Sequence, residues 1–303
     1  MVIDVLVVGD ANPDLVLRGD VHPRFGQAEQ VLDSADLTLG GSAALVAHGL
    51  ARLGVSVGLC AALGADAYAD FVLDYLTTAG VDCRHVVTVP EPTGLSVILS
   101  SADRAILTHL GAIAALQPAH LPDPAGFAHV HAASVYLVQG TRPALPGYLG
   151  AAASSSLDTN DDPAGTWADI AGLLAASDYA LPNEAELARW AEVLGCPGSS
   201  TGDLAWQSQA ACVAATGATL AIKRGADGGA VVTPGGDAID VAAPAITPVD
   251  TTGAGDTFDA GFIAALLDGR SLSDCLDWAV RAGAASTQAA GGAPAQPRRS
   301  DLR

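Results

Sequence analysis

The stretch Asp250-Thr-Thr-Gly-Ala-Gly-Asp256-Thr-Phe258 combines a glycine turn, an acidic residue and the start of a helix. The apolar run at 245–249 predicts a strand before it, and the spacing of Phe258, Phe262 and Ala265 predicts a helix after it. Two glycines at a helix start let the backbone approach a ligand and point several N–H groups at one position. Because the positive end of the helix dipole lies there too, the turn is predicted to bind an anion.

Asp256 lies inside this predicted anion site, where a carboxylate would weaken the binding of a phosphate. Its position suits a base that takes a proton from an incoming hydroxyl while the N–H groups hold the phosphoryl group. The alternative is structural, with Asp256 as a helix N-cap after a glycine turn. An isolated Gly-x-Gly-Asp sequence would favour the cap.

Strand-like apolar runs alternate with helical patterns along most of the chain, which predicts an α/β fold with a mainly parallel sheet covered by helices on both faces. Two segments lack this alternation: 13–39 is polar and strand-like, and 93–110 predicts a hairpin with a turn at Ser100–Asp103. We expect them to form a small sheet that acts as a lid and excludes water from the reacting phosphate. The expected division is a main domain of 1–12, 40–91 and 111–303 and a lid of 13–39 and 92–110.

Composition narrows the possible partners. The 303 residues carry a net charge of −19 with only 14 Lys and Arg, which argues against nucleic acid and anionic membranes as partners. No apolar run reaches the length of a membrane span, and the first eight residues predict a buried strand and no signal peptide. The five scattered cysteines predict free thiols in a reducing cytosol, so a cytoplasmic location is expected.

The segment Asp250–Phe258 resembles the C-terminal signature of the ribokinase-like (PfkB) carbohydrate kinases. Five other segments resemble further motifs of that family in the family's order: 9–14, 40–54, 157–160, 182–186 and 222–228. The resemblance implies a three-layer α/β/α fold with a mainly parallel central sheet and a small β-sheet lid. It also implies an ATP-dependent kinase that phosphorylates a primary hydroxyl of a sugar or sugar derivative.

The resemblance also implies roles for individual residues. Asp256 would be the catalytic base, and the backbone of 253–255 the anion hole. The remaining roles fall into four groups. The sugar would be held by Asn12, Asp14, Gly40 and Gly41, and the phosphoryl group by Gly253, Ala254 and Gly255. Mg²⁺ and its waters would be positioned by Asn183 and Glu186, and the ATP would be bordered by Lys223, Gly225 and Gly228. A site that resembles a monovalent-cation site for K⁺ consists of Asp250 and Thr252, with carbonyls near Gly291–Gly292.

Each of these assignments has a structural alternative. Asn12 and Asp14 could form a turn around Pro13, and Gly40-Gly41 could be a tight helix entry. Asn183 and Glu186 could form a capping box, and Lys223 could be solvated at a strand end. His129 and His131 alternate on one strand face like a metal pair, but no third ligand is near in sequence, so packing is the preferred interpretation.

Three positions depart from the family pattern. Leu45 stands where the family has a sugar-binding Asn, Asp161 or Asp162 where it often has an Arg, and Gln139 where ribokinases often have a Glu. These changes disfavour ribose and 2-keto-3-deoxygluconate as acceptors. Arg104, on the expected lid, is the remaining cation that could select the substrate.

Two other functions compete with a sugar kinase. A nucleoside kinase of the same superfamily fits the apolar Leu45, and Phe25 could provide a surface for a base. A non-catalytic sugar-binding protein would be expected to have lost the base or the anion hole, and both are present. A dehydrogenase is disfavoured because Gly9-Asp-Ala-Asn12 lacks the dinucleotide-binding glycine pattern, and the chain has no P-loop. The alternating segment 13–39 permits a homodimer through the lid.

Overall fold

The computed structural model describes residues 3–101, 104–196 and 205–302. Its centre is an eight-stranded sheet in the order β14-β13-β12-β11-β10-β9-β1-β4. All neighbouring strands are parallel except in the pairs β12–β13 and β13–β14, which are antiparallel. The mainly parallel sheet predicted from the sequence is therefore confirmed. The strands are β1 (Val5–Val8), β4 (Val57–Cys60), β9 (His129–Ala133), β10 (Ser155–Asp158), β11 (Tyr179–Ala180), β12 (Thr219–Lys223), β13 (Gly229–Val232) and β14 (Ala238–Val241).

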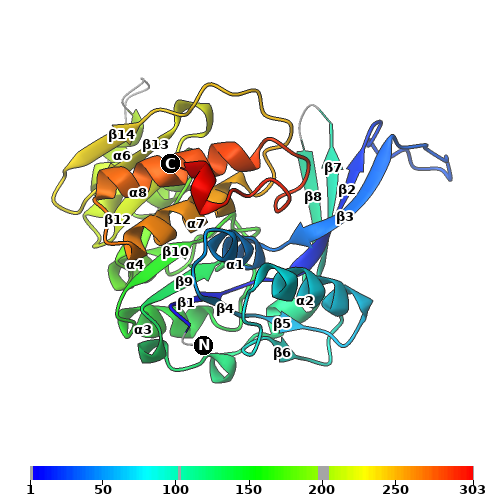
Figure 1. Cartoon of the computed structure of the whole chain (residues 1–303), viewed down its shortest axis with the longest axis horizontal. Helices are drawn as coiled ribbons and strands as arrows, with labels where there is room; N and C mark the ends of the chain where they lie inside the picture. The colour runs from blue at the N-terminus through cyan, green and yellow to red at the C-terminus, as the bar shows by residue number, and fades with distance from the viewer. Residues whose placement is uncertain (1–2, 102–103, 197–204, 303) are drawn as a thin grey trace.

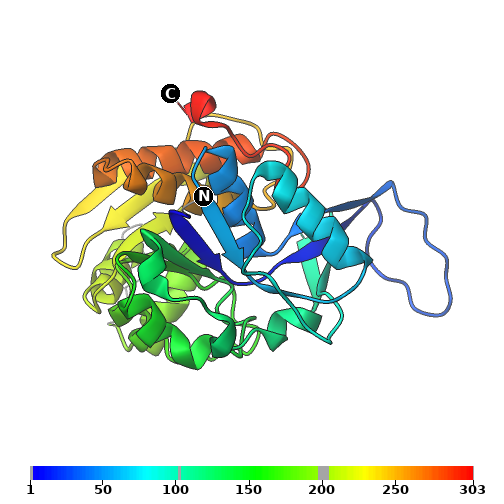
Figure 2. The same cartoon turned by 60° about the horizontal axis from the view of Figure 1, so that its bottom comes forward.

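Helices cover both faces of this sheet and make two hydrophobic cores (Figures 1 and 2). Strand β1 illustrates the division, because Val5 and Val7 belong to one core and Leu6 and Val8 to the other. One face carries α1 (Ser42–Arg52), α2 (Ala67–Ala79), α7 (Ala254–Leu267) and α8 (Leu272–Ser286), and the other α3 (Leu145–Gly150), α4 (Ile170–Ala176), α5 (Glu184–Val193) and α6 (Ala205–Ala214).

A separate four-stranded sheet, hereafter the small sheet, projects from one end of the molecule (Figure 1). Its order is β3-β2-β7-β8, and β2 runs parallel to β7 but antiparallel to β3. Strand β2 follows β1 closely and β3 leads directly into α1, so the small sheet is connected to the carboxyl edge of the central sheet. The strands are β2 (Asn12–Arg18), β3 (Ser34–Gly40), β7 (Leu95–Ser100) and β8 (Arg104–His109). Residues 102 and 103 of the predicted hairpin turn lie outside the described residues.

Several predicted elements were wrong. The expected strand at 245–249 is absent from this described segment, because Pro244 and Pro248 cannot donate ladder hydrogen bonds. Strand β9 ends at Ala133 although the apolar run continues to Val138, since Ser134 takes a left-handed φ of 51°. Helices α3 and α6 and strand β14 were not predicted. A β5–β6 pair (Ala62–Leu63, Val87–Thr88) forms a further two-stranded sheet.

The cysteine prediction was also wrong in part. Cys196, just after α5, forms a disulfide with Cys212 on α6, with their Cα atoms 5.9 Å apart. Sequence spacing does not show that these two helices pack together, so the pairing was not foreseeable from it. Cys60, Cys83 and Cys275 are free thiols. Among the described residues, no helix is both long and apolar enough to cross a bilayer.

Candidate active site

Charged residues gather where parallel strands of the central sheet end. Asp10 follows β1, Asp158 ends β10 and Lys223 ends β12. Carboxyl ends of parallel strands meet at one edge of an α/β sheet, which is where such folds bind ligands. The first residues of α1 and α7 face the same edge, so two helix N-termini point toward this group of side chains.

The glycine turn before α7 has two different physical reasons for its glycines. Gly253 takes a left-handed φ of 68°, and a Cβ there would lie 2.7 Å from the Cα of Gly292, so both conformation and packing require glycine. At Gly255 a Cβ would meet only the Lys223 side chain, at 3.6 Å, which is ordinary contact. The fold alone does not require glycine at 255, and the small residue leaves backbone accessible to a ligand.

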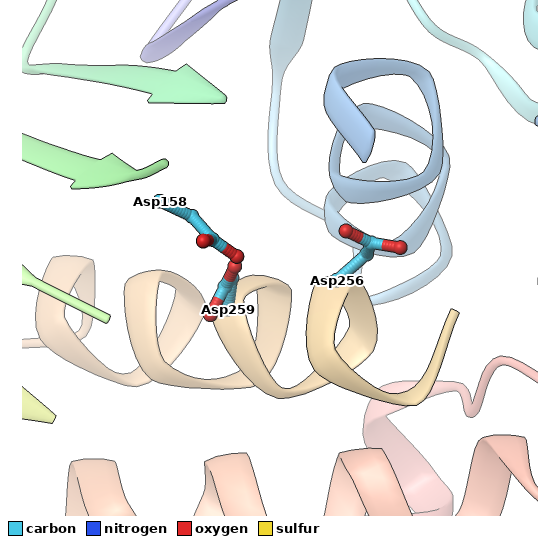
Figure 3. A group of neighbouring side chains, drawn as sticks. All are labelled: Asp158, Asp256 and Asp259. Carbon is cyan, nitrogen blue, oxygen red and sulfur yellow. The ribbon is translucent and has the colours of Figure 1, made fainter. Parts of the chain in front are cut away.

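Asp256 lies in the first turn of α7 and is buried (Figure 3). The hydroxyl of Ser42, the first residue of α1, donates to its Oδ1 at 2.5 Å. Burial raises the pKa of Asp256 to about 7, with the charge of Asp158 adding to the rise and the Ser42 hydrogen bond opposing it. A carboxyl group that titrates near neutral pH can accept a proton and release it again, as a general base must. Sequence reasoning did not foresee Ser42.

Asp14 and Asn12 face this region from β2, so the alternative that they form a turn is wrong. The Asn12 side-chain amide donates to Asp14 Oδ1 at 2.9 Å, and a Cβ at Gly40 would fall 1.9 Å from that same oxygen. Gly40 is therefore required for Asp14 to occupy its place. Burial raises the pKa of Asp14 to about 7, and the charge of the neighbouring Asp10 contributes to this rise.

Asp10 was not predicted as a site residue. Its carboxylate accepts a hydrogen bond from the N–H of Ala43 at 3.0 Å, in the first turn of α1. Gly41 precedes that helix with a φ of 84°, and a Cβ there would lie 2.9 Å from the Asp10 carbonyl oxygen. The tight helix entry expected as an alternative at Gly41 is thus present, and it brings the start of α1 against the end of β1.

Lys223 lies between two buried carboxylates and is not solvated at a strand end. Its Nζ is 2.5 Å from Asp158 Oδ2 and 2.9 Å from Asp259 Oδ1. Asp158, Asp259 and Asp256 each offer an oxygen within 4.8 Å of the others, and Figure 3 shows the first two pointing toward one another. Although burial would raise the pKa of Asp158, the ammonium group lowers it. Burial raises the pKa of Asp259, which sequence reasoning missed.

Asn183 and Glu186 form the capping box that was the structural alternative for them. Glu186 Oε2 accepts from the Asn183 N–H and Asn183 Oδ1 from the Glu186 N–H, both at 2.9 Å. Burial raises the pKa of Glu186 to about 7, and the charge of Asp158 contributes. A buried carboxyl group at a helix start beside other carboxylates can also help to bind a cation, so the capping box does not exclude that role for Glu186.

The other residues expected near the nucleotide lie in the turn between β12 and β13. Gly225 and Gly228 have left-handed φ values of 54° and 95°. A Cβ at Gly228 would come within 2.0 Å of the Val241 carbonyl oxygen, so the hairpin itself requires this glycine.

Asp250 is held by the backbone around it and by the small sheet. Its Oδ1 accepts from the Thr252 N–H and hydroxyl at 2.9 and 2.7 Å, and its Oδ2 from the Gly291 N–H at 3.0 Å and Arg18 Nη2 at 3.1 Å. Arg104 Nη1 reaches the Thr252 hydroxyl at 3.4 Å. A cavity of about 250 Å³ beside this group separates the small sheet from the loop at 248–251, and both arginines line it.

The departures from the family pattern differ in their surroundings. Leu45 is buried, and a Cβ at Gly292 would lie 3.0 Å from its side chain. Asp162 accepts hydrogen bonds from its own loop, including the Trp167 N–H at 2.7 Å, so it is a structural residue there. Gln139 is exposed on the turn after β9. Phe25 is 97% exposed and provides no slot for a base.

His129 and His131 are packed as expected. Both are fully buried and share the Ser156 hydroxyl, at 2.7 and 2.8 Å. Burial lowers the pKa of His129 to about 3 and that of His131 to about 4, so both rings are neutral at physiological pH.

A helix N-terminus and a buried aspartate at the carboxyl edge of a parallel sheet are typical of an α/β protein that binds an anionic small molecule at that edge. The family model of the pfkB family carbohydrate kinases matches residues 2–299 of the sequence, so the chain belongs to this family. It is therefore an ATP-dependent phosphotransferase that acts on a hydroxyl group.

Similar proteins come from distant organisms. The chain is 30% identical to a ribokinase of Arabidopsis thaliana over 98% of this chain and 79% of that one. It is 31% identical to an ATP-dependent ribose-1-phosphate kinase of Halopiger xanaduensis over 92% of this chain and 90% of that one. The solved structure of Arabidopsis thaliana ribokinase complexed with ribose and ATP matches with a TM-score of 0.80 at 26% identity, covering 100% of this chain and 98% of that one.

We predict that Lys223→Met lowers the free energy of unfolding by about 3–5 kcal/mol, because it leaves two buried carboxylates without their cation. The control is Arg281→Met, which removes an exposed ion pair with Asp277 and should cost less than about 1 kcal/mol. Urea unfolding followed by circular dichroism compares the two. Equal stability of both variants would contradict the structural role assigned to Lys223.

Proposed function

We propose that the protein transfers the γ-phosphoryl group of ATP to a primary hydroxyl of a sugar or sugar derivative, with Asp256 as the general base. The single observation that carries this proposal is the position of Asp256. It combines a pKa of about 7, burial, a hydrogen bond from Ser42 and a place in the first turn of α7. No other buried carboxyl among the described residues starts a helix behind a Gly-Ala-Gly turn.

In this mechanism the sugar hydroxyl approaches Asp256 from the side of β2. We propose that other hydroxyls of the acceptor are held by Asn12, Asp14, Gly40 and Gly41, since Asn12 and Asp14 are hydrogen-bonded to each other and Asp14 lies against Gly40. Asp256 takes the proton as the hydroxyl oxygen bonds to the γ-phosphorus and the bond from that phosphorus to the bridging oxygen breaks, with ADP as the leaving group. The first N–H groups of α7, at 253–255, have no helical carbonyl partner and stabilise the charge on the transferred group.

A cation fits the nucleotide side of the site. Four carboxyl groups lie around one ammonium group there, so the region has an excess of buried negative charge; they are Asp158, Asp256, Asp259 and Glu186 around Lys223. We propose that Glu186 and Asn183 hold Mg²⁺ through water, and that Lys223, Gly225 and Gly228 border the nucleotide. When bound, Mg²⁺ neutralises the phosphate charges of ATP.

A sugar is a better acceptor for this site than a nucleoside. The aromatic side chain considered for stacking a base, Phe25, is fully in solvent, and Leu45 packs against Gly292. The non-catalytic alternative is disfavoured because base and anion hole are both intact. Arg104 stays the candidate for substrate selection from the small sheet.

We also propose a homodimer in which the small sheet of one copy covers that of the other. Leu37, Ile106 and Leu107 are large apolar side chains exposed on this sheet, and β8 is an exposed edge strand. Sedimentation velocity should therefore give a dimer that Ile106→Lys converts to a monomer. A wild-type protein that sediments as a monomer would contradict the proposal.

We predict that Asp256→Asn lowers kcat by about 10²–10⁴-fold, the usual contribution of a general base, with little change in acceptor binding. An ADP-release assay across sugars, sugar phosphates and nucleosides first identifies the acceptor, and the variant is then compared with wild type on it. The fold should survive, because an asparagine side-chain oxygen can still accept from Ser42. Near-normal turnover in the variant would rule out Asp256 as the base.

A further inference from the structure

Arg18 joins the small sheet to the loop that begins the glycine turn. It is the last residue of β2, and its Nη1 donates to Asp36 on β3 at 2.7 Å while its Nη2 donates to Asp250 at 3.1 Å. The two contacts differ in environment, because the Asp36 side chain is 59% exposed and that of Asp250 14%. The contact to Asp250 is therefore the less screened of the two.

The Asp250 carboxylate has no oxygen left for another cation. A carboxylate oxygen offers two lone-pair sites, and each Asp250 oxygen already accepts from two donors. Burial would raise the pKa of Asp250, but the hydrogen bonds from Gly291, Thr252 and Arg18 hold it below its usual range, so the group is negatively charged. The guanidinium group of Arg18 forms an ion pair with it.

This donor set does not fit the monovalent-cation site expected at Asp250 and Thr252. The Thr252 hydroxyl donates to Asp250 at 2.7 Å, and a metal ion on Asp250 Oδ2 would lie against the guanidinium group, a like charge. Asp250 holds the N–H and the hydroxyl of Thr252, the residue directly before Gly253, so its carboxylate is connected to the start of the turn at 253–255.

We propose that Arg18 is a positioning residue that provides the positive charge at Asp250, so that turnover does not require K⁺. The inference rests on the proposed kinase function. A guanidinium group suits this task because it is always charged and can donate to two carboxylates at once. Because Arg18 belongs to the small sheet, it also fixes the position of that sheet relative to the glycine turn.

The test compares turnover in chloride salts of potassium, sodium and choline at equal ionic strength. Wild type should differ by less than about twofold among them. Arg18→Met should lose at least about tenfold in kcat in choline, the scale of a lost hydrogen bond to a charged group, and recover most of it in potassium, which can then bind the vacated carboxylate. Arg18→Lys should keep turnover without potassium. Asp36→Asn is the matched control, since it removes only the exposed contact and should behave like wild type.

Thermal unfolding gives a readout that does not depend on turnover. Potassium chloride should raise the Tm of Arg18→Met above its value in choline chloride and leave wild type unchanged. Activation of wild type by potassium of about tenfold or more, or full activity of Arg18→Met in choline, would overturn the proposal. Absence of turnover in wild type with every acceptor would refute the kinase function instead, and the Tm comparison would still decide the role of Arg18.

Discussion

Burial of negative charge around a single ammonium group governs the site. Lys223 contacts Asp158 and Asp259, and Asp256 and Glu186 are buried nearby. Removing a carboxylate from water favours its protonated form, so the pKa values of these two groups rise to about 7. Burial of these carboxyl groups therefore has two consequences. Asp256 titrates near neutral pH, and an added cation would stabilise the site.

Two helix N-termini lie beside these buried carboxyl groups. The first turns of α1 and α7 meet at Asp256, where Ser42 of α1 donates to it. Each helix start also places the positive end of a helix dipole there, which favours a transferred phosphoryl group beside an otherwise anionic cluster. A chain with a net charge of −19 can thus bind ATP locally, through backbone dipoles.

Much of the fold followed from the sequence because its signals are local. The apolar run at the start of the chain predicted a buried strand, and the glycine turn at 253–255 predicted the start of α7. The segments 13–39 and 93–110, which lack the alternation of strands and helices, predicted the separate small sheet. Prediction failed where prolines interrupt an apolar run and where partners lie far apart in the chain. The strand expected at 245–249 was wrong because the apolar pattern outweighed Pro244 and Pro248, and the pairing of Cys196 with Cys212 depends on how α5 and α6 pack.

The candidate site divides in the same way. Asp256 and Asp14 were named from motifs, whereas Asp259 and Arg18 were missed because their significance comes from contacts 36 and 232 residues away in sequence. Asp259 is three residues after Asp256 on α7, so helical periodicity places it near the same edge. That spacing could have indicated Asp259 as a site residue, but it does not show that Asp259 contacts Lys223.

The most direct test of the account is the titration of Asp256 itself. Infrared difference spectra of wild type minus Asp256→Asn, recorded from pH 4 to pH 9, isolate its carboxyl C=O band. The account predicts a protonated carboxyl at acid pH that is half ionised at about pH 7. A group already ionised near its ordinary value of 3.8 would contradict the claim that burial prepares Asp256 to act as the base.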